Sequence, residues 1–293
     1  MADISVATNR RLFWRGRARR PLEPSPIAYI FYPVLAAAII LPLSWALFGG
    51  FKNPNELFTY PPTIWPRSPT LQNFVDIFTR LEFGRYIWNT IVVAFFTVLL
   101  TLFLGGLAGY ALSRWDFQGK EAMMIGLLGL QLIPSTVNIV PYYMIMSSLG
   151  LLNTLTGLVL IYTATHIPIT IWVLKGFFDT VPRALDEAAA IDGCSKWRTF
   201  WSVIIPLSLP GLSVAGFLVF VSAWSEFLVP LVIASNKNVA VASVGLFTFF
   251  GPDQATSYTS LFAATLITVT PVVIGYLFAQ RYIVSGLTAF AEK

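Results

Sequence analysis

The chain has 293 residues, of which 56% are hydrophobic and 11% are charged, and its 19 Lys and Arg against 14 Asp and Glu give a net charge of +5. Soluble domains carry about a quarter charged residues, so this composition excludes a soluble enzyme and indicates a membrane protein with several spans. A single cysteine, Cys194, excludes a disulfide within the chain, and together with a single histidine it predicts no metal site.

The chain begins with a basic stretch, residues 1–26, that contains six arginines. It lies directly before the first long apolar run and lacks aromatic interleaving suited to stacking on bases. We therefore expect a tail that orients the chain in a membrane and no binding of nucleic acid. Residues 44–46 loosely fit a signal-peptide cleavage site, but the run is longer than the apolar part of a signal peptide, which favours an uncleaved first span.

Six apolar runs are long enough to cross ~30 Å of hydrocarbon, which takes roughly 20 helical residues. They lie near residues 27–49, 86–112, 123–147, 153–178, 207–234 and 259–280. We predict an all-α fold, a polytopic membrane protein with six transmembrane helices within residues 27–281. With the N-terminus inside the cell, 14 of the 19 Lys and Arg lie on the cytoplasmic side, which predicts cytoplasmic tails at 1–26 and 282–293.

Two longer segments, 50–85 and 235–258, are predicted on the external side. The first is rich in proline and ends in residues 71–78, whose apolar spacing suits a short helix lying on the membrane. The second is largely apolar between residues 239 and 250, so it should not be a simple solvated loop.

The third and fourth runs carry polar side chains beside prolines. Gln131 and Asn138 flank Pro134 in the third run, and His166 precedes Pro168 in the fourth. Irregular backbone at membrane depth needs a cavity or protein around it, so we expect both helices to be broken and to face a substrate pathway. The alternative for the neighbouring hydroxyl residues is that they satisfy carbonyls of their own helix. For His166, a pathway position and a bond between helices both remain open.

A polar break at residues 182–206 separates the fourth and fifth runs. Its first part is rich in Ala, Leu and Glu and follows a proline, which predicts a short helix that ends at Gly193. Ser195 suits the N-cap of a second helix with Trp and Phe on one face. The charged residues, Asp186 among them, should face water, and the small residues should allow close approach by a soluble partner. The residues predicted for this contact are Glu187, Ala188, Ala189, Asp192 and Gly193.

The fifth run holds a carboxylate, Glu226, with Trp224 nearby. A charge within a span is expensive unless it reaches water, a partner or a proton. One interpretation is that Trp224 stacks on a sugar ring and Glu226 accepts from sugar hydroxyls. The alternative is that Glu226 lies near the outer end and bonds to a neighbouring helix or a partner subunit. The residues predicted for the substrate pathway are Gln131, Asn138, His166, Trp224 and Glu226.

The break at 182–206 also carries a motif. Glu187-Ala188-Ala189, three residues, Gly193, nine residues and then residues 203–206 resemble the signature of permease subunits of ATP-binding-cassette importers, with valine and isoleucine where the signature has isoleucine and leucine. The resemblance extends over most of the chain and is greatest to the carbohydrate-importer branch, to the type of the smaller maltose-importer permease. It implies a type I importer transmembrane fold, in which 182–206 is the coupling loop that docks on an ATPase.

The resemblance also implies the partners and the place of action. These are a second permease subunit in a heterodimer, an ATP-binding-cassette ATPase dimer that binds ATP and Mg, an extracytoplasmic solute-binding protein and the lipid of a bacterial or archaeal cytoplasmic membrane. This subunit itself is expected to hold no cofactor. The implied function is uptake of a sugar, an oligosaccharide or a related polyol, by alternating access, and the lack of Lys or Arg at mid-span favours an uncharged solute.

The sequence contains no phosphate-binding Gly-x-x-x-x-Gly-Lys-Ser/Thr motif, because Gly119 and Lys120 are followed by Glu121. Without a nucleophile motif or paired carboxylates we expect a transport subunit and not an enzyme. The alternative function is a stand-alone secondary carrier or channel for a small polar solute. The lack of a recognisable internal repeat argues against such a carrier.

Overall fold

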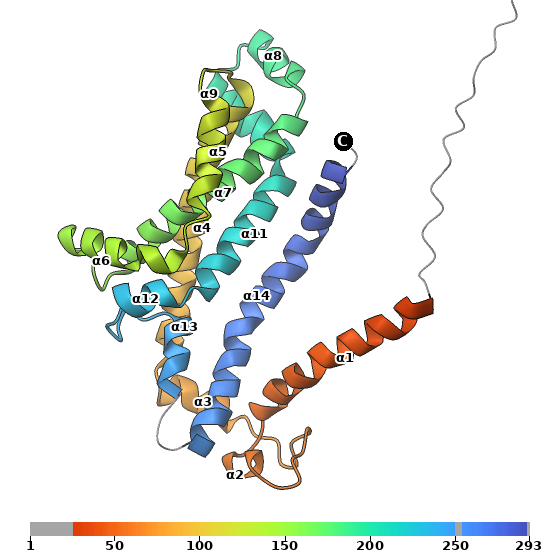
Figure 1. Ribbon diagram of the computed structural model, residues 1–293, viewed down its shortest axis with the longest axis vertical. Helices are drawn as coiled ribbons and strands as arrows, with labels where there is room; N and C mark the ends of the chain where they lie inside the picture. Colours follow the sequence, from red (N-terminus) through yellow and green to blue (C-terminus); the bar gives the residue numbers. More distant parts are fainter. Residues whose placement is uncertain (1–25, 250–253, 292–293) are drawn as a thin grey trace, which may run out of the picture. The chain divides into compact units, whose positions relative to one another are not determined.

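The computed structural model describes residues 26–249 and 254–291, and in these residues the chain forms helices and turns without any strand (Figure 1). The predicted all-α fold is confirmed. The chain divides into two compact units, residues 1–45 and 46–293, and the boundary between them falls inside the first helix.

Four described helices are each long and apolar enough to cross a membrane. They are α1 (Pro26–Gly49), α4 (Phe83–Arg114), α7 (Leu155–Thr180) and α14 (Gln254–Ala291). Two further spans are bent, so the structure accommodates the six predicted spans. The first of them turns by 87° from α5 (Lys120–Leu130) into η1 (Ser135–Asn138) and α6 (Ile139–Ser148).

The second bent span turns by 80° between α10 and α11. It consists of α9 (Lys196–Thr199), the π-helical segment η2 (Phe200–Ile204), α10 (Ile205–Leu207) and α11 (Leu209–Ser225). The remaining helices are short. They are α2 (Pro54–Leu57), α3 (Gln72–Thr79), α8 (Ala184–Ile191), α12 (Leu228–Ile233), α13 (Ala242–Gly245) and η3 (Leu246–Phe249).

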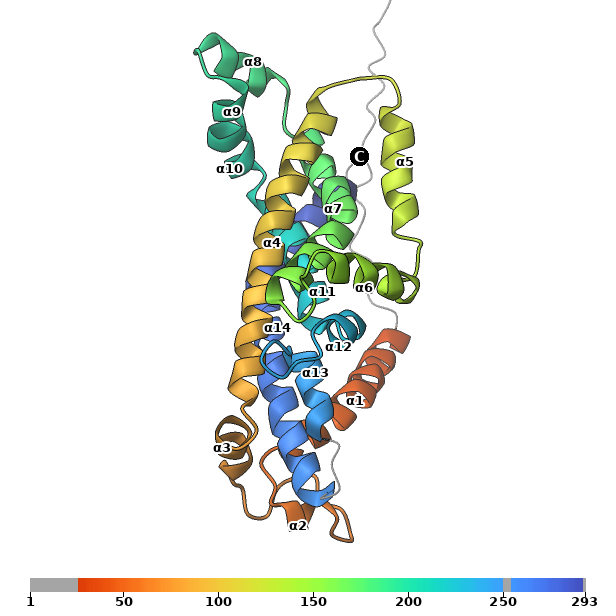
Figure 2. The same cartoon turned by 90° about the vertical axis from the view of Figure 1, so that its left-hand side faces the viewer.

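Helices α4 and α7 lie side by side at the centre of the second unit (Figures 1 and 2). Glycines on α4 permit this approach: a Cβ at Gly105 would lie 2.7 Å from Thr170 Cγ2, and one at Gly109 would lie 3.2 Å from Lys175 N. Small residues let helix backbones approach closely where lipid supplies no hydrophobic driving force. Helix α11 packs against α4 and α7, and α14 packs against α11.

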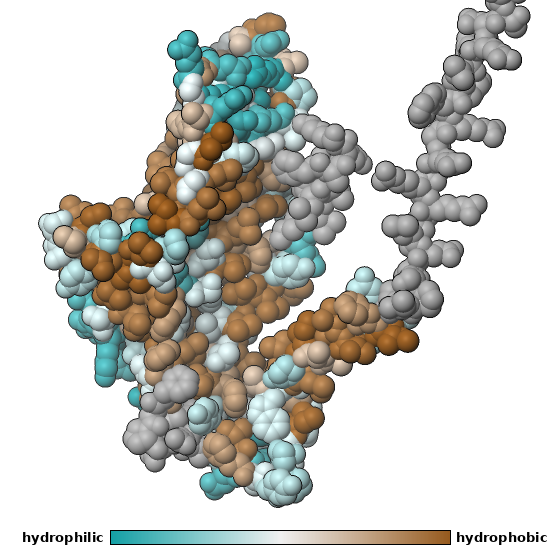
Figure 3. Space-filling model, in the orientation of Figure 1, coloured by the Kyte–Doolittle hydropathy of each residue, from teal (hydrophilic) through white to brown (hydrophobic). Residues whose placement is uncertain are grey.

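Helix α4 begins beside α3 and ends near α8, so we refer to the α3 end and the α8 end of the second unit (Figure 2). Hydrophobic side chains cover the middle of this unit, and hydrophilic side chains gather around α8 and α9 (Figure 3). A hydrophobic middle with a hydrophilic end suits a body that crosses a bilayer and presents α8 to water.

At the α3 end, buried amide side chains hold the chain around Gly50 and around Ala240, which belong to the two segments predicted on the external side. Asn73 on α3 donates to the carbonyl of Gly50 at 2.8 Å, and Asn89 on α4 donates to the carbonyl of Ala240 at 2.9 Å. The helix predicted near residues 71–78 is confirmed as α3. Ala240 itself is buried, so the apolar segment that contains it packs into the protein as its composition suggested.

Two predicted spans differ in detail from the observed helices. The fifth run was expected to continue to residue 234, but α11 ends at Ser225 and Glu226 is extended, with φ −64° and ψ 130°. The fourth run was expected to break near Pro168, but α7 is one continuous helix with Pro168 inside it.

Candidate functional site

The structure of the α8–α9 hairpin, residues 184–199, agrees with what helix-dipole, turn and capping preferences predict from its own residues. Asp186 and Glu187 lie in the first turn of α8, where the helix dipole favours negative charge. Gly193 turns the chain with φ +78°, and a Cβ there would meet no atom within 4 Å, so its backbone conformation and not a neighbour requires glycine. The Ser195 hydroxyl accepts from the Arg198 N–H at 3.3 Å and caps α9, as predicted.

Most of the predicted contact residues face away from the protein. The exposed ones are Glu187, Ala188, Asp192 and Gly193. Ala189 is buried, and Ile191 at the end of α8 is 87% exposed. A soluble partner would therefore meet small residues, two carboxylates and one apolar side chain, a surface suited to docking in a groove.

Contrary to the prediction that it faces water, Asp186 is bonded to side chains of α4. The Tyr110 hydroxyl donates to its Oδ1 at 2.7 Å, and Arg114 Nε lies 2.9 Å from its Oδ2 in an ion pair. The expectation of a solvated side chain is wrong because Arg114, itself 8% exposed, needs a negative partner where α4 ends.

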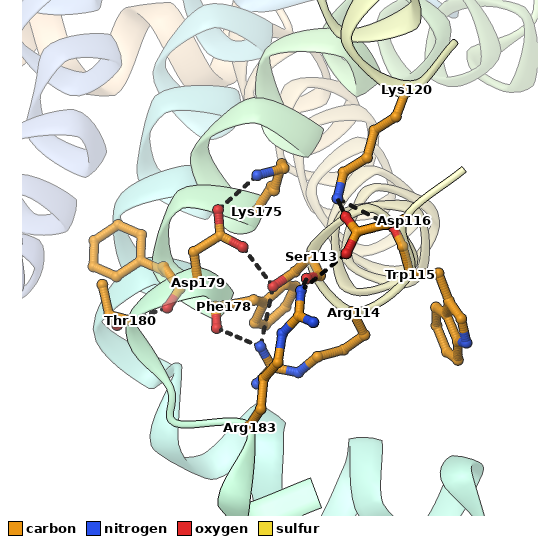
Figure 4. Close-up of polar contacts among 11 residues, drawn as sticks. Ser113, Arg114, Trp115, Asp116, Lys120, Lys175, Phe178, Asp179, Thr180 and Arg183 are labelled. Atoms are coloured by element: carbon orange, nitrogen blue, oxygen red, sulfur yellow. Dashed lines mark hydrogen bonds and ion pairs between the residues drawn. The ribbon is translucent and has the colours of Figure 1, made fainter. Parts of the chain in front are cut away.

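Figure 4 shows the polar network at the α8 end, where α4 and α7 both end. Arg114 donates from Nη1 to the carbonyl of Phe178 and from Nη2 to that of Val181, each at 3.1 Å. The Phe178 carbonyl also accepts from the Val181 N–H, so Arg114 adds a second donor there and supplies one to the Val181 carbonyl just past the end of α7. The Ser113 hydroxyl donates to Asp179 at 2.6 Å and forms a second link between the two helices.

Exposed ion pairs surround this network. Lys120 lies 2.7 Å from Asp116, and the hydrogen bond that it donates holds the pKa of the Asp116 carboxyl below its ordinary value. Lys175 lies 2.6 Å from Asp179. Such pairs contribute little to stability because water screens them, so they mark the water-facing rim of this end.

A second candidate site is a cavity of about 300 Å³ at the break in the third span. Helix α5 ends at Leu130, and the chain turns past Pro134, which cannot donate a backbone hydrogen bond, into η1. Gln131 donates to the carbonyl of Thr165 at 3.0 Å and so ties the turn to α7. The polar residues of the lining are Gln131, Ser135, Asn138, Tyr142 and Thr165, and no lining residue is charged. The predicted break is confirmed, and Gln131 and Asn138 both line the cavity beside it.

His166 does not line this cavity. Its Nδ1 lies 2.7 Å from the carbonyl of Tyr162, and the Thr165 hydroxyl donates to the carbonyl of Ile161 at 3.0 Å. The predicted break in the fourth span is wrong, because α7 runs through the buried Pro168 while packed along α4, and neighbouring helices can hold a membrane helix together at a proline. His166 instead lines a separate cavity of about 180 Å³ with residues of α7 and α11.

Trp224 is 3% exposed and lies in the core formed by α4, α7 and α11. Its Nε1 donates to the carbonyl of Thr268 at 2.9 Å, and its ring centroid lies 5.3 Å from that of Phe220. This packing leaves no open ring face and does not support the predicted role as a platform for sugar.

Glu226 satisfies its charge through the backbone. Its Oε1 accepts from the N–H groups of Phe227, Leu228 and Val229 at 3.2, 3.1 and 3.4 Å. The carboxylate therefore starts α12, and its own carbonyl accepts from the Ser243 hydroxyl at 2.6 Å. Neither interpretation predicted these bonds of the carboxylate to the next residues of its own chain, and both interpretations stay predictions.

Sequence reasoning missed the pairing of Asp186 with Arg114 and Tyr110. The available signal was a basic residue directly after an apolar run, which meets a helix end that needs donors. Within the described residues, no group of three or more His, Cys, Asp or Glu side chains is arranged to hold a metal ion.

Comparison with known proteins finds one matching family and several similar transport proteins. A family model described as "Binding-protein-dependent transport system inner membrane component" matches residues 6–288. The sulfoquinovosyl glycerol transport system permease protein SmoH of Agrobacterium fabrum is 34% identical over 293 residues, which cover 100% of both chains. The trehalose/maltose transport system permease protein MalG of Thermococcus litoralis is 36% identical over 271 residues, which cover 91% of this chain and 96% of that protein.

Two solved structures share the fold. One is the crystal structure of a bacterial ABC transporter involved in the import of the acidic polysaccharide alginate, with a TM-score of 0.74 at 19% identity, covering 90% of this chain and 99% of that chain. The other is a bacterial alginate ABC transporter in complex with an alginate pentasaccharide-bound periplasmic protein, with a TM-score of 0.60 at 16% identity, covering 86% of this chain and 92% of that chain.

Proposed function

Because the chain belongs to the family of binding-protein-dependent transport system inner membrane components, we propose that it is one of two permease subunits through which an ATP-driven importer moves a sugar or related polyol. The family is a transport component without enzymatic activity, so the predicted family and the prediction that this subunit is not an enzyme are confirmed. The sugar, the full set of partners and the transport cycle are the proposed part.

The observation that carries the proposal is the exposed α8–α9 hairpin. It stands at the end where α4 and α7 also end, and it presents Glu187, Ala188 and Gly193 outward. We assign it as the contact for an ATPase dimer that binds ATP and Mg, and we expect no cofactor in this subunit. The second permease subunit contributes an equivalent contact to the other ATPase.

The proposed orientation places the α8 end in the cytoplasm. Both tails, 1–26 and 282–293, are then cytoplasmic, and the α3 end faces an extracytoplasmic solute-binding protein. The hydrophilic surface around α8 and α9 supports contact of this end with water (Figure 3). The distribution of Lys and Arg along the chain supports the cytoplasmic side for it over the external side.

The cavity at the break in the third span supports an uncharged, hydroxyl-rich solute. Gln131 and Asn138 offer both donors and acceptors, and the Tyr142 ring lies beside them. The relative MalG is named for transport of trehalose and maltose, two uncharged sugars, and supports the same class of substrate. The relative SmoH is named for sulfoquinovosyl glycerol and supports a sugar, but one that carries a sulfonate. We assign Gln131 and Asn138 to the substrate pathway, and we do not assign Trp224.

The cycle is alternating access. ATP binding closes the ATPase dimer, the docked hairpins of the two permeases move together, and the spans switch from an inward-open to an outward-open state. The nucleotide can drive this switch only by as much as its affinity differs between the two states. The hairpin must therefore transmit displacement to the spans without bending.

The test is reconstitution of the complete complex in proteoliposomes. The companion solute-binding protein is first screened with a panel that includes maltose, trehalose, a neutral trisaccharide and an anionic sugar, and the sugar bound most tightly is then used for uptake. We expect uptake that requires both the solute-binding protein and ATP on the ATPase side. Uptake by this chain alone, without ATPase or binding protein, would instead support a stand-alone carrier.

A further inference from the structure

We propose that Arg114 is a positioning residue that fixes the α8–α9 hairpin to the ends of α4 and α7, so that a displaced hairpin carries both helices with it. The inference rests on the proposed function, because an ATPase must displace the hairpin. Arg114 is the last residue of α4, and its side chain is 8% exposed. A nearly buried cation where three helices meet is the observation that needs an explanation.

One guanidinium joins three helices. Its two Nη atoms donate to the carbonyls of Phe178 and Val181 where α7 ends, and its Nε lies 2.9 Å from Asp186 Oδ2 on α8. The guanidinium is planar and its donors have a fixed geometry. The two hydrogen bonds therefore persist together only while the ends of α4 and α7 keep their relative positions, and the ion pair, which is not aligned as a hydrogen bond, holds α8 to them by charge and proximity.

Tyr110 holds the second oxygen of the same carboxylate. Its hydroxyl donates to Asp186 Oδ1 at 2.7 Å. Its ring centroid lies 5.1 Å from that of Phe200 and 6.1 Å from that of Phe178, inside a buried hydrophobic cluster. Both oxygens of Asp186 are thus fixed by residues one helical turn apart on α4.

Helix α9, the second helix of the hairpin, contacts Trp115, the residue directly after Arg114. Lys196 Nζ lies 4.7 Å from the centroid of the Trp115 ring, within the range of a cation–π contact. A cavity of about 240 Å³ lies between the two attachments, lined by residues of α4, α8 and α9. Arg183, directly before α8, also donates to the carbonyl of Ser113 at 3.2 Å. Among these attachments of the hairpin, the Arg114–Asp186 ion pair is the one between largely buried side chains.

Burial is what separates the Arg114–Asp186 pair from the other ion pairs of this end. The pairs of Lys120 with Asp116 and of Lys175 with Asp179 are more exposed, and water can replace either partner. Separating a buried pair leaves an uncompensated charge, so this pair stays closed while the hairpin moves. Since α4 packs along α7 and α11, displacement of the hairpin reaches the spans through α4.

Two substitutions test the contacts of Asp186 with Arg114 and Tyr110. Asp186→Asn removes the charge of Asp186 at nearly constant shape, and Tyr110→Phe removes only the Tyr110 hydroxyl and keeps its packed ring. The matched control is Asp76→Asn. Asp76 lies on α3 at the opposite end, its side chain is 19% exposed against 21% for Asp186, and it lies 3.3 Å from Arg80. All three variants are studied in the purified complex with the second permease, the ATPase and the solute-binding protein.

The measurement is hydrogen–deuterium exchange with and without the non-hydrolysable nucleotide AMP-PNP, which needs no knowledge of the sugar. In the unaltered complex we expect the nucleotide to change exchange in α8 and in the last turns of α4. In Asp186→Asn we expect the nucleotide-dependent change of exchange in α8 to remain. The change in α4 should fall by at least about fivefold, the lower end of the roughly 5–150-fold effects typical of coupling between sites. Tyr110→Phe gives a smaller loss, and Asp76→Asn gives none.

Equal changes in α4 for the unaltered complex, Asp186→Asn and Tyr110→Phe would overturn the inference while leaving the proposed function intact. A loss in Asp76→Asn as large as in Asp186→Asn would also overturn it, because loss of any carboxylate would then suffice. No nucleotide response of α8 in the unaltered complex would contradict the proposed function, and the inference with it.

Discussion

Two acidic residues, Glu226 and Asp186, show how the surroundings of one carboxylate decide its role. Glu226 interrupts an apolar run, and three backbone N–H groups just after it satisfy its charge. Asp186 lies in a polar loop, where solvation was the natural expectation, yet Arg114 and Tyr110 hold it. The first carboxylate shapes the backbone, and the second joins two helices.

Residues governed by local rules could be predicted, and residues governed by distant partners could not. Gly193 and Ser195 follow from turn and capping chemistry within a few residues of each. Trp224 is fixed by a carbonyl 44 residues further along the chain, and Asp186 by a hydroxyl 76 residues before it. Residue patterns can mark one member of such a pair, as Arg114 directly after an apolar run, but they do not identify its partner until the helices are placed in space.

The first prediction separates a pathway residue from a packing residue. Asn138→Ala should raise the sugar concentration for half-maximal uptake by roughly fivefold or more, since an unpaired polar contact costs about 1–3 kcal/mol, and should leave the melting temperature unchanged. Trp224→Ala should lower the melting temperature of the complex, because truncating a buried Trp costs about 3–5 kcal/mol. The reverse pattern, with normal stability and weak uptake for Trp224→Ala, would restore Trp224 to the pathway.

At the scale of elements, prolines in two apolar runs had different consequences. Pro134 coincides with a break between α5 and η1, where Gln131 reaches across to α7. Pro168 is buried inside a continuous α7, which packs along α4. Sequence alone marks both prolines as breakers, and the packing of each helix decides which one breaks.

The second prediction concerns the packing of α4 on α7. Gly105→Ala should destabilise the complex by about 1–3 kcal/mol, because its Cβ would lie 2.7 Å from Thr170 Cγ2 in a packed interface. Gly126→Ala is the matched control, since Gly126 also lies within a helix but a Cβ there meets no atom within 4 Å. Gly126→Ala should leave the stability of the complex unchanged or raise it. Melting temperatures that fall equally for both variants would contradict close packing of α4 on α7.

At the scale of the whole molecule, composition and apolar length were enough to predict six spans, and the motif at 182–206 was enough to predict an exposed helical hairpin. Both signals are strong because membrane thickness and turn chemistry constrain them directly. The contribution of the tertiary structure is the joint between this hairpin and the spans, formed by Arg114 across three helices.

The third prediction concerns orientation. In a Cys194→Ala background, single cysteines at Asn55 and Asn238 should react from outside the cell with an impermeant thiol reagent, and one at Gln118 should react only after permeabilisation. All three positions are exposed, so access through the membrane and not burial decides the result. Labelling of the Gln118 position alone in intact cells would place the α8 end outside.

The central claim is that the α8–α9 hairpin couples an ATPase to transport, and one comparison tests it most directly. Gly193 and Gly150 both have positive φ, +78° and +68°, and a Cβ at either meets no atom within 4 Å. Gly193 lies in the hairpin, whereas Gly150 lies in the turn between α6 and α7. Aspartate therefore strains both turns to a similar extent, and only the first lies at the proposed ATPase contact.

The measurement is ATP-dependent uptake in proteoliposomes containing the complete complex. We expect Gly193→Asp to abolish uptake, with loss of the ATPase from the complex or of its stimulation by the solute-binding protein, and Gly150→Asp to retain both uptake and stimulation. Normal coupled uptake by Gly193→Asp, or equal losses in the two variants, would contradict the account.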